Sequence, residues 1–534
     1  MEFDYVIVGG GSAGSVMAAR LSEDPNTTVC LLEAGGQGDS LLVRSPMALL
    51  AMLPGWGKIN NWAFHTVPQK ELKNRRLYHP RGRALGGSSA INAMLYVRGH
   101  PSDYDDWAAQ GATGWGWDDV LPYFLKSERN RVHEGDLHGQ DGPLHVSDQQ
   151  DPRPIAEAFI AAAEECQIPR NPDFNGPRQE GAGYYQVTQF SGDGRNGERC
   201  SAAAAYLHPN LTRPNLEVLT QARGLRVIQS EGRATGVLAR LPGGNRIITA
   251  RREVILCGGA FHSPQLLMLS GIGPGAALQA QGITVQHDLP DVGQNLQDHL
   301  DFILAYHANT TDLLGIGFQG AKDLIRHALE WRKTGRGMVA TPGAEAGAFL
   351  TVGQGDRPDV QLHFVPAIVE NHARRLHLGY GYSCHACVLR PKSRGEVTLN
   401  SADPMDAPRI DPRYLSHPDD AQDLLDAAIA MRQIMRAPAM VKYQTREIFT
   451  DGVPDEELLS HIRERAGTIY HPVGTCRMGT DEGAVTDPKG RVRGVAGLRV
   501  VDASLMPTLI GGNTNAPVIM MAEKIAAGMR SAPN

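Results

Sequence analysis

The sequence has few of the features that mark disulfide-rich, nucleic-acid-binding or membrane-spanning proteins. Only 7 of its 534 residues are cysteine, too few for a disulfide framework, so we expect reduced thiols. The formal net charge is −6 and no run of five or six like charges occurs, which excludes the basic field that nucleic-acid binding needs. No stretch reaches 18 apolar residues, so we expect no membrane-spanning helix.

The remaining composition is that of a globular protein, with 42% hydrophobic and 21% charged residues. The N-terminus enters a strand-like run without the charged start and cleavage site of a signal peptide, which predicts a cytoplasmic location. The apolar segment 41–56 is interrupted by Arg44, Pro46 and Pro54. It leaves peripheral association with the inner membrane open as an alternative.

The first strong signal is a predicted strand–turn–helix at the N-terminus. Phe3 to Val8 is an unbroken β-favouring run, as expected for a strand buried on both faces of a parallel sheet. The GxGxxG turn of residues 9–14 follows, and then an apparent helix. A second predicted strand, Thr28 to Leu32, completes a βαβ unit. This order predicts dinucleotide binding, but it does not separate FAD from NAD.

Each residue of this unit has a physical role. Gly9 permits the tight turn, Gly11 lets the backbone approach a pyrophosphate, and Gly14 lets the helix pack closely on the strand. The helix N-terminus offers free N–H groups and a positive dipole end to the phosphates. Glu33 follows the second strand, 24 positions after Gly9, and is placed to accept hydrogen bonds from an adenosine ribose.

Further Rossmann-like pieces lie far along the chain. Glu253 to Cys257 is another buried-strand run and precedes a predicted helix at Ser263 to Leu269, while Leu498 to Val501 is a third run that ends at Asp502. The region 310–460 instead mixes helical and alternating strand-like stretches. We therefore predict an α/β protein whose Rossmann-like domain is discontinuous and holds an inserted α+β substrate domain. The predicted division gives residues 1–155, 200–308 and 464–534 to the dinucleotide-binding domain, and residues 156–199 and 309–463 to the substrate-binding domain.

Four motifs, in order, resemble those of the glucose–methanol–choline oxidoreductase family over essentially the full length. They are the N-terminal fingerprint with Glu33, PRGRALGGSSAINAM at residues 80–94, GAFHSPQLLMLSGIG at residues 259–273, and the C-terminal set HPVGTCRMG at 471–479, VDAS at 501–504 and GNTNAP at 512–517. Among family members, the chain looks most like bacterial alcohol dehydrogenases of the choline-dehydrogenase and sorbose-dehydrogenase types.

The resemblance implies bound FAD with a substrate domain over the flavin. Together with the N-terminal unit, it assigns cofactor contacts to Gly9, Gly11, Ser12, Ala13, Gly14, Glu33, Ala34, Arg83, Gly86, Gly87, Ser88, Asn92, Ala93, Met94, Gly224, Asp502, Ala503, Asn513 and Pro517. Gly224 stands where many relatives have a valine. Some relatives attach FAD through a histidine just before the asparagine of the second motif. Here that residue is Ile91, which has no nucleophile, so we predict non-covalent FAD.

His471 is the predicted catalytic base. Oxidising an alcohol by hydride transfer to flavin N5 requires removal of the hydroxyl proton, and histidine suits proton transfer near neutral pH. The chain has 19 histidines. Without the motif around it, the simpler interpretation of His471 would be a hydrogen-bonded core residue. Asn515 is the predicted partner that holds the substrate oxygen. The same residue also fits a helix N-cap ahead of Pro517.

Trp62 and Met94 are predicted near the flavin or the substrate channel, although packing alone would also explain them. Cys384 and Cys387 form a CxxC, but in a strand positions three apart point to opposite faces, so we interpret them as structural thiols. His299 has no clustered partners in the sequence and is interpreted as structural, and no metal site is predicted. No GxSxG elbow supports a hydrolase.

The predicted function is FAD-dependent oxidation of a small-molecule alcohol to an aldehyde or ketone, with electrons passed to a quinone or another carrier. An oxygen-using alcohol oxidase and an FAD-containing hydroxynitrile lyase are the alternatives within the fold family. An NAD-dependent dehydrogenase that uses only the N-terminal fingerprint, and a redox-dead flavoprotein, are further rivals. The sequence leaves the alcohol and the electron acceptor open.

Overall fold

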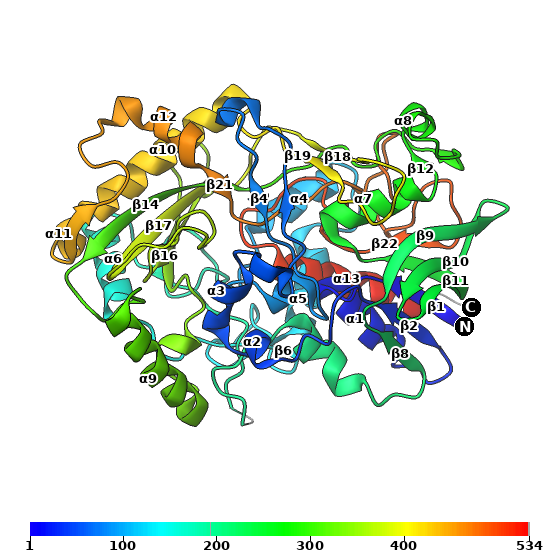
Figure 1. The fold of residues 1–534 in the computed structure, drawn as a ribbon, viewed down its shortest axis with the longest axis horizontal. Helices are drawn as coiled ribbons and strands as arrows, with labels where there is room; N and C mark the ends of the chain where they lie inside the picture. Colours follow the sequence, from blue (N-terminus) through cyan, green and yellow to red (C-terminus); the bar gives the residue numbers. More distant parts are fainter. Residues whose placement is uncertain (193, 532–534) are drawn as a thin grey trace.

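The structure, a computed structural model, describes residues 1–192 and 194–531. Two seven-stranded sheets organise these residues. In Figure 1 the first sheet lies at the right, beside both chain termini, and the second lies at the left. Within the described residues, no helix combines the length and the hydropathy that crossing a membrane requires.

The first sheet has a parallel core. Its strands are β8 (Leu216–Leu219), β2 (Val29–Leu32), β1 (Glu2–Val8) and β11 (Gly244–Leu256), and β22 (Leu498–Val500) also pairs with β11. Because helices cover its faces, β1 is buried from Asp4 to Val8. The antiparallel strands β10 (Arg233–Leu241) and β9 (Arg223–Ser230) extend the sheet beyond β11. The predicted βαβ unit and its distant partner strands are therefore confirmed.

Two helices that pack together beside this sheet begin within the sequence motifs: one in the glycine turn and one in the C-terminal motif. Helix α1 (Ser12–Leu21) connects β1 to β2, and α13 (Asn515–Ser531) packs against α1. Both helices are rich in alanine and are buried over most of their length, which allows close approach. Helix α7 (Gly259–Leu269) follows β11 and packs on β9.

The second sheet is antiparallel, in the order β20 (Gln444–Glu447), β14 (Leu300–Ala308), β17 (Gly381–Val388), β16 (Val360–Val365), β15 (Ala346–Leu350) and β7 (Gly181–Tyr184). Strand β21 (Gly467–Thr468) also pairs with β14. Helices α6 (Pro154–Glu165) and α10 (Pro418–Met435) pack on this sheet.

The sheet pairing differs from the predicted division at two places. Strand β14 begins at Leu300, so residues 300–308 lie in the second sheet although the sequence analysis gave them to the dinucleotide-binding domain. Strand β21 belongs to the same sheet, whereas its residues were grouped with the C-terminal segment. Both strands are linked to the second sheet by long-range hydrogen bonds, which no local pattern reveals.

The remaining elements are short or peripheral. The other helices are α2 (Leu41–Arg44), α3 (Leu49–Met52), α4 (Pro101–Ala109), α5 (Trp117–Ser127), α8 (Gly275–Ala280), α9 (Phe318–Thr334), α11 (Pro438–Val441) and α12 (Leu458–Arg465). Two-stranded pairs are formed by β3 (Phe64–His65) with β4 (Tyr78–His79), β5 (Glu128–Asn130) with β6 (Leu144–Val146), β12 (Ile272–Gly273) with β13 (His287–Asp288), and β18 (Glu396–Thr398) with β19 (Arg409–Asp411).

Candidate active site

A cavity of about 380 Å³ lies where the two sheets meet. Residues just after the carboxyl ends of the parallel strands line it: Gly9 after β1, Glu33 after β2, Gly258 after β11 and Asp502 after β22. Open parallel sheets bind ligands at this edge. Residues of the second sheet, such as His363, line the opposite wall. The cavity therefore has a nucleotide end, formed by the first sheet, and a catalytic end, where His471 lies.

The nucleotide end begins at the glycine turn. Gly9 has a φ of +106°, and a Cβ there would lie 2.4 Å from the Cys257 carbonyl oxygen. A Cβ at Gly14 would lie 1.9 Å from the Gly9 carbonyl oxygen, which matches the close helix–strand packing expected of Gly14. Helix α1 has no side-chain cap at Gly11, so its first N–H groups and its positive dipole end are directed at the cavity.

The second motif closes this turn from the other side. A Cβ at Gly87 would lie 2.6 Å from the Cα of Gly11, so only glycine allows the two loops to approach this closely. The Gly86 N–H donates to the Gly10 carbonyl oxygen at 2.7 Å. In contrast, a Cβ at Gly11 would meet only the Gly87 Cα, at 3.9 Å, which leaves the cavity side of Gly11 open for a ligand. The space between these loops is a cradle made of backbone.

Glu33 is buried at the end of β2 and is held by the glycine turn. Its carboxylate accepts hydrogen bonds from the N–H groups of Gly10, at 2.9 Å, and Gly35, at 2.7 Å. Burial raises its pKa to about 7 despite those donors. The side chain lines the cavity with carboxylate lone pairs still available, as a contact to ribose hydroxyls requires.

Asp502 makes four hydrogen bonds within the protein. It accepts from the Gly259 N–H at 2.9 Å and the Ser263 hydroxyl at 2.6 Å, and its other oxygen accepts from the N–H and the hydroxyl of Ser504. Burial raises its pKa. Asp502 lines the cavity and at the same time fixes the start of α7 against the loop after β22.

At the catalytic end, the hydrogen bonds of two histidines define the protonation of His471. The Nε2–H of His299 donates to the Leu389 carbonyl oxygen at 2.9 Å, because a carbonyl can only accept. The Nδ1 of neutral His299 is therefore a bare acceptor, and it lies 2.9 Å from the Nδ1 of His471. His471 must then carry its proton on Nδ1, which leaves a bare lone pair on Nε2.

The His471 ring is buried, and its pKa is lowered well below the ordinary value of 6.5, first by burial and then by the nearby His299, His363 and Arg81. Burial also lowers the pKa of His299 to about 4, so both rings are neutral at pH 7. The neutral Nε2 of His471 is thus in the form that accepts a proton.

The backbone that carries His471 is fixed from behind. The His471 N–H donates to Asp298 at 2.7 Å, and the same carboxylate accepts from the hydroxyls of Thr468, at 2.6 Å, and Tyr414. Tyr470 has a φ of +79°, which is strained for a residue with a side chain. Its carbonyl oxygen accepts a hydrogen bond from the Arg81 guanidinium at 2.7 Å. The strained turn aims the imidazole into the cavity.

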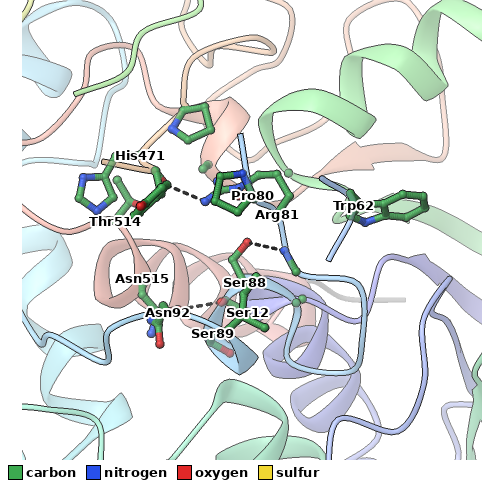
Figure 2. A pocket seen from close by; sticks show the side chains of 18 of the residues that line it. Ser12, Trp62, Pro80, Arg81, Ser88, Ser89, Asn92, His471, Thr514 and Asn515 are labelled. Atoms are coloured by element: carbon green, nitrogen blue, oxygen red, sulfur yellow. Dashed lines mark hydrogen bonds between the residues drawn. The ribbon is translucent and has the colours of Figure 1, made fainter. Parts of the chain in front are cut away.

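The neighbour of His471 Nε2 is Asn513, not Asn515. The Asn513 Nδ2 lies 3.3 Å from His471 Nε2, and its Oδ1 accepts from the Gln361 amide at 3.0 Å, which fixes the orientation of the Asn513 amide. Asn515 begins α13, and its Oδ1 accepts from the Ser12 hydroxyl at 2.7 Å (Figure 2). The turn before α13 thus directs positions 513 and 515 to different partners, although both side chains line the cavity.

Most of the predicted site residues share this cavity. Its lining includes Gly9, Gly11, Ser12, Ala13, Glu33, Ala34, Gly87, Ser88, Asn92, Ala93, Met94, Gly224, Asp502, Ala503, Asn513, His471, Asn515 and Trp62. The predicted contacts Gly14, Arg83, Gly86 and Pro517 lie outside the lining. Gly14 and Gly86 instead pack the glycine loops together, as described above.

Trp62 lies far from the predicted substrate channel. Figure 2 shows it on the opposite side of the pocket from His471. Its ring packs on His262, with centroids 4.5 Å apart, and lies beneath the guanidinium groups of Arg83 and Arg223. This places Trp62 beside the nucleotide end. Met94 has a φ of +61°, is fully buried and lines the cavity, so it remains a candidate for the flavin side.

Sequence reasoning missed three side chains at the catalytic end. His299 was interpreted as structural, yet its ring contacts His471. Gln361 and His363 lie two positions apart on β16, on the same face of the strand. His363 is buried against the cavity, and neither of its ring nitrogens has a hydrogen-bond partner among the described residues. The polar Gln–x–His pair inside an apolar strand was the signal that could have identified Gln361 and His363.

The cysteines form no disulfide in the described part of the chain, where all seven are free. Cys384 and Cys387 are buried on β17, and burial raises the pKa of both thiols. No group of three potential metal ligands occurs in residues 1–192 and 194–531.

A backbone cradle for a pyrophosphate, a carboxylate for a ribose and a neutral imidazole across one cavity define a dinucleotide-dependent oxidoreductase. Comparison with known proteins gives the family. Residues 3–301 and residues 391–522 match two family models, both described as GMC oxidoreductase. The chain belongs to this family.

Similar proteins cover nearly the whole chain. Alcohol dehydrogenase [acceptor] from Pseudomonas putida is 46% identical over 98% of this chain and 95% of its own length. Oxygen-dependent choline dehydrogenase from Burkholderia vietnamiensis is 43% identical over 99% and 94%. The crystal structure of pyridoxine 4-oxidase from Mesorbium loti superposes with a TM-score of 0.88 at 33% identity and covers all of both chains. The protein is therefore an FAD-dependent oxidoreductase that acts on the CH–OH group of alcohols.

The residues present fit FAD. The open side of Gly11 and the uncapped start of α1 suit a pyrophosphate, and Glu33 suits the adenosine ribose. The Nε2 of His262 is buried at the Trp62 end without a partner among the described residues, so it can bond a cofactor group there. The same cavity is lined by His262 at this end and by His471 at the other.

Proposed function

We propose that His471 Nε2 removes the hydroxyl proton of the substrate while the Asn513 amide holds the substrate oxygen. Bound FAD supplies the two-electron acceptor that takes hydride from the same carbon. The observation that carries this proposal is the hydrogen-bond chain from Leu389 through His299 to His471, which leaves a bare Nε2 beside the Asn513 Nδ2. A substrate hydroxyl between them donates to Nε2 and accepts from Nδ2.

As the proton leaves, negative charge develops on the substrate oxygen. Gln361 holds the Asn513 carbonyl oxygen, so the Asn513 amide nitrogen faces His471 Nε2, and a bound alcohol oxygen beside Nε2 accepts a hydrogen bond from it. His363, with both ring nitrogens unpartnered, offers a second hydrogen-bonding group to the bound alcohol. We also propose that FAD is bound non-covalently, since Ile91 packs against Val43 and Met52 and has no reactive atom.

We further propose an apolar alcohol as the substrate. Apolar side chains of the early segment and of the segments around β16 and α9 line the cavity: Met47, Leu49, Leu50, Leu53, Leu314, Met338, Val365, Pro366 and Val369. A quaternary ammonium group such as that of choline is favoured by a cage of aromatic rings. Trp62, Phe261 and Tyr470 are the aromatic residues in the cavity lining, and of these Tyr470 alone adjoins His471; a single ring is not a cage, which disfavours choline here.

We propose that the electrons pass to a quinone or another carrier, with oxygen as the alternative acceptor. An acceptor-type dehydrogenase in Pseudomonas putida is among the similar proteins, as is a pyridoxine 4-oxidase. The second candidate function, a lyase that retains FAD without net redox, has no feature of the cavity in its favour.

An anaerobic panel of alcohols tests the proposal. Straight-chain, aromatic, sugar and choline-type alcohols are added to the purified protein, and loss of the visible flavin absorbance is followed. We expect bleaching with apolar alcohols, slow recovery in air and fast recovery with a soluble quinone. A cleaved cyanohydrin without bleaching would establish the lyase instead, and rapid recovery in air would establish an oxidase.

A further inference from the structure

Helix α9 exposes an unusual amount of apolar surface. Over its 17 residues, only Gly320 and Trp331 are buried. Phe318 is 80% exposed, Ile325 64% and Leu329 66%. Figure 1 shows α9 projecting from the body at the lower left. Monomeric proteins rarely leave contiguous large apolar side chains in water, so this helix face has a partner.

The exposed apolar side chains form one stripe. With 3.6 residues per turn, Phe318, Ile325 and Leu329 fall within about 40° of one another around the helix axis. Gly320 and Trp331 lie on roughly the opposite side, where the Trp331 indole donates to the Gly197 carbonyl at 2.9 Å. One face of the helix is thus anchored to the protein through Trp331, and the opposite, apolar face is exposed to solvent.

Basic side chains border the stripe. Lys322, Arg326 and Lys333 lie along one edge of the stripe and Arg332 lies along the other, all within roughly 80° of the stripe's centre around the helix axis. Asp323 and Glu330 lie at larger angles from the centre of the stripe. Asp323 pairs with Arg326, and Glu330 lies 3.3 Å from His327. No carboxylate of the described residues forms an ion pair with the other three cations. The surface is therefore cationic in a chain whose net charge is −6.

A neighbouring loop also exposes apolar side chains. Leu376 and Leu378 are 61% and 77% exposed. Their loop is joined to α9 by a bridge between Ile316 and Gly379 and by the Tyr380 hydroxyl, which donates to Asp323 at 2.8 Å. Phe318, Ile325, Leu329, Leu376 and Leu378 are called the α9 surface below.

The segments on either side of α9 line the cavity. Leu314, four residues before α9, lines the cavity, and so do Met338 and residues 341–344 after it. The 3-10 turn η7 (Met338–Ala340) packs against both α9 and the early turn η1 (Pro46–Ala48), whose Met47 also lines the cavity. Whatever binds the exposed face of α9 therefore lies close to this wall of the cavity.

We propose that the α9 surface docks the enzyme on an anionic lipid bilayer. An apolar stripe with a border of lysine and arginine is the pattern of helices that lie in the membrane interface, where the apolar side chains enter the acyl boundary and the cations meet anionic headgroups. A lipid surface accepts this stripe without a matching shape, whereas a protein partner would need one. Docking brings the cavity wall next to the bilayer, in which apolar alcohols and quinones dissolve; this consequence rests on the proposed function, but the docking does not.

Vesicle co-sedimentation of the FAD-loaded protein tests the proposal. We expect binding to mixed phosphatidylcholine–phosphatidylglycerol vesicles and little binding to phosphatidylcholine alone, with the difference reduced by salt. Lys322→Gln with Lys333→Gln should weaken binding roughly tenfold to thirtyfold. Ile325→Asp with Leu329→Asp should abolish it. Turnover of a short, water-soluble alcohol should stay unchanged in both variants, which separates a failure of docking from a failure of the proposed function.

Ile247→Asp is the matched control, because Ile247 is 52% exposed on β11 of the first sheet, away from α9. It should bind vesicles like the unmodified protein. Flavin absorbance and melting temperature verify that each variant is folded, and the two lysine substitutions keep the test valid if the aspartates prevent folding. Equal binding to neutral vesicles, or undiminished binding by the folded variants, would overturn the proposal. So would a dimer in solution that Ile325→Asp with Leu329→Asp separates, because the surface would then join two copies of the chain.

Discussion

The two ends of the cavity are built by different means. The nucleotide end consists of backbone: glycine turns at Gly9–Gly14 and Gly86–Gly87, an uncapped helix start, and one carboxylate at the end of a strand. The catalytic end consists of side chains from distant segments, with His299, Gln361, His471 and Asn513 joined by hydrogen bonds. A backbone cradle needs small residues near in sequence, whereas an acid–base pair needs particular side chains that the fold brings together.

Replacing His471 should therefore affect only one end. In His471→Ala the proton acceptor is lost, and we expect anaerobic flavin reduction to slow by about 10²–10⁴-fold. FAD content should barely change, because the ring is not part of the cradle. Stopped-flow absorbance gives the rate and the ratio of flavin to protein absorbance gives the content. A parallel loss of both would show that His471 has a structural role.

Substitutions of Asn513 and Asn515 should likewise differ in their effect on the rate of flavin reduction. Asn513→Ala removes the donor directed at the substrate oxygen, and we expect flavin reduction to slow by about 10²–10³-fold. Asn515→Ala keeps that donor and removes the bond to Ser12, so its effect on the rate should be smaller. Rates at saturating alcohol measure this difference. A larger loss in Asn515→Ala would return the catalytic role to Asn515.

At the nucleotide end, Gly87→Ala should weaken FAD binding while leaving the acid–base pair intact. Its φ of +52° and the 2.6 Å approach to Gly11 Cα imply a cost of about 1–3 kcal/mol, or roughly 5- to 150-fold in the FAD dissociation constant. Gly36→Ala is the control in the same region, since a Cβ there meets nothing within 4 Å. Titration of the apoprotein with FAD gives both constants. Equal constants would mean that the loops can separate without cost.

Gln361 should have a smaller, indirect effect. Gln361→Leu leaves the Asn513 amide free to rotate, and the loss of one neutral hydrogen bond, about 1 kcal/mol, predicts a roughly fivefold fall in kcat. FAD content is the internal control. In the double variant with Asn513→Ala, the Gln361 substitution should cause no further fall, because it acts through that amide. An additive loss would indicate an independent role.

The smallest expected effect concerns pH. Burial and the positive Arg81 lower the pKa of His471. The other titratable groups that face it are neutral His299 and His363, and Asp298 accepts from its backbone N–H. Because the base works in its neutral form and a lowered pKa keeps it neutral at lower pH, the acid limb of kcat/KM should lie below pH 6.5. A pH profile with a non-titrating alcohol measures it. A limb above 6.5 would contradict the neutral pair.

Much of the fold could be predicted because its signals are local. The strands at Phe3–Val8 and Leu498–Val501 and the helix after the glycine turn were recognised from runs and spacings of a few residues. Strands β14 and β21 were grouped with the FAD-binding segments because their pairing partners in the second sheet are far away in the sequence. The orientation of residues 513 and 515 depended on a turn whose geometry is set by Gln361 and Ser12, on other elements.

The sequence by itself determined the glycine cradle, the acid at the end of β2 and the identity of His471 as the candidate base. These depend on backbone conformations that only glycine permits, or on a motif contiguous in the chain. Only the tertiary structure decided that His299 leaves Nε2 of His471 bare, that Asn513 is its neighbour and that Trp62 lies at the far end of the cavity. A proton's position depends on which groups meet in space, and that meeting occurs only after the two sheets have packed together.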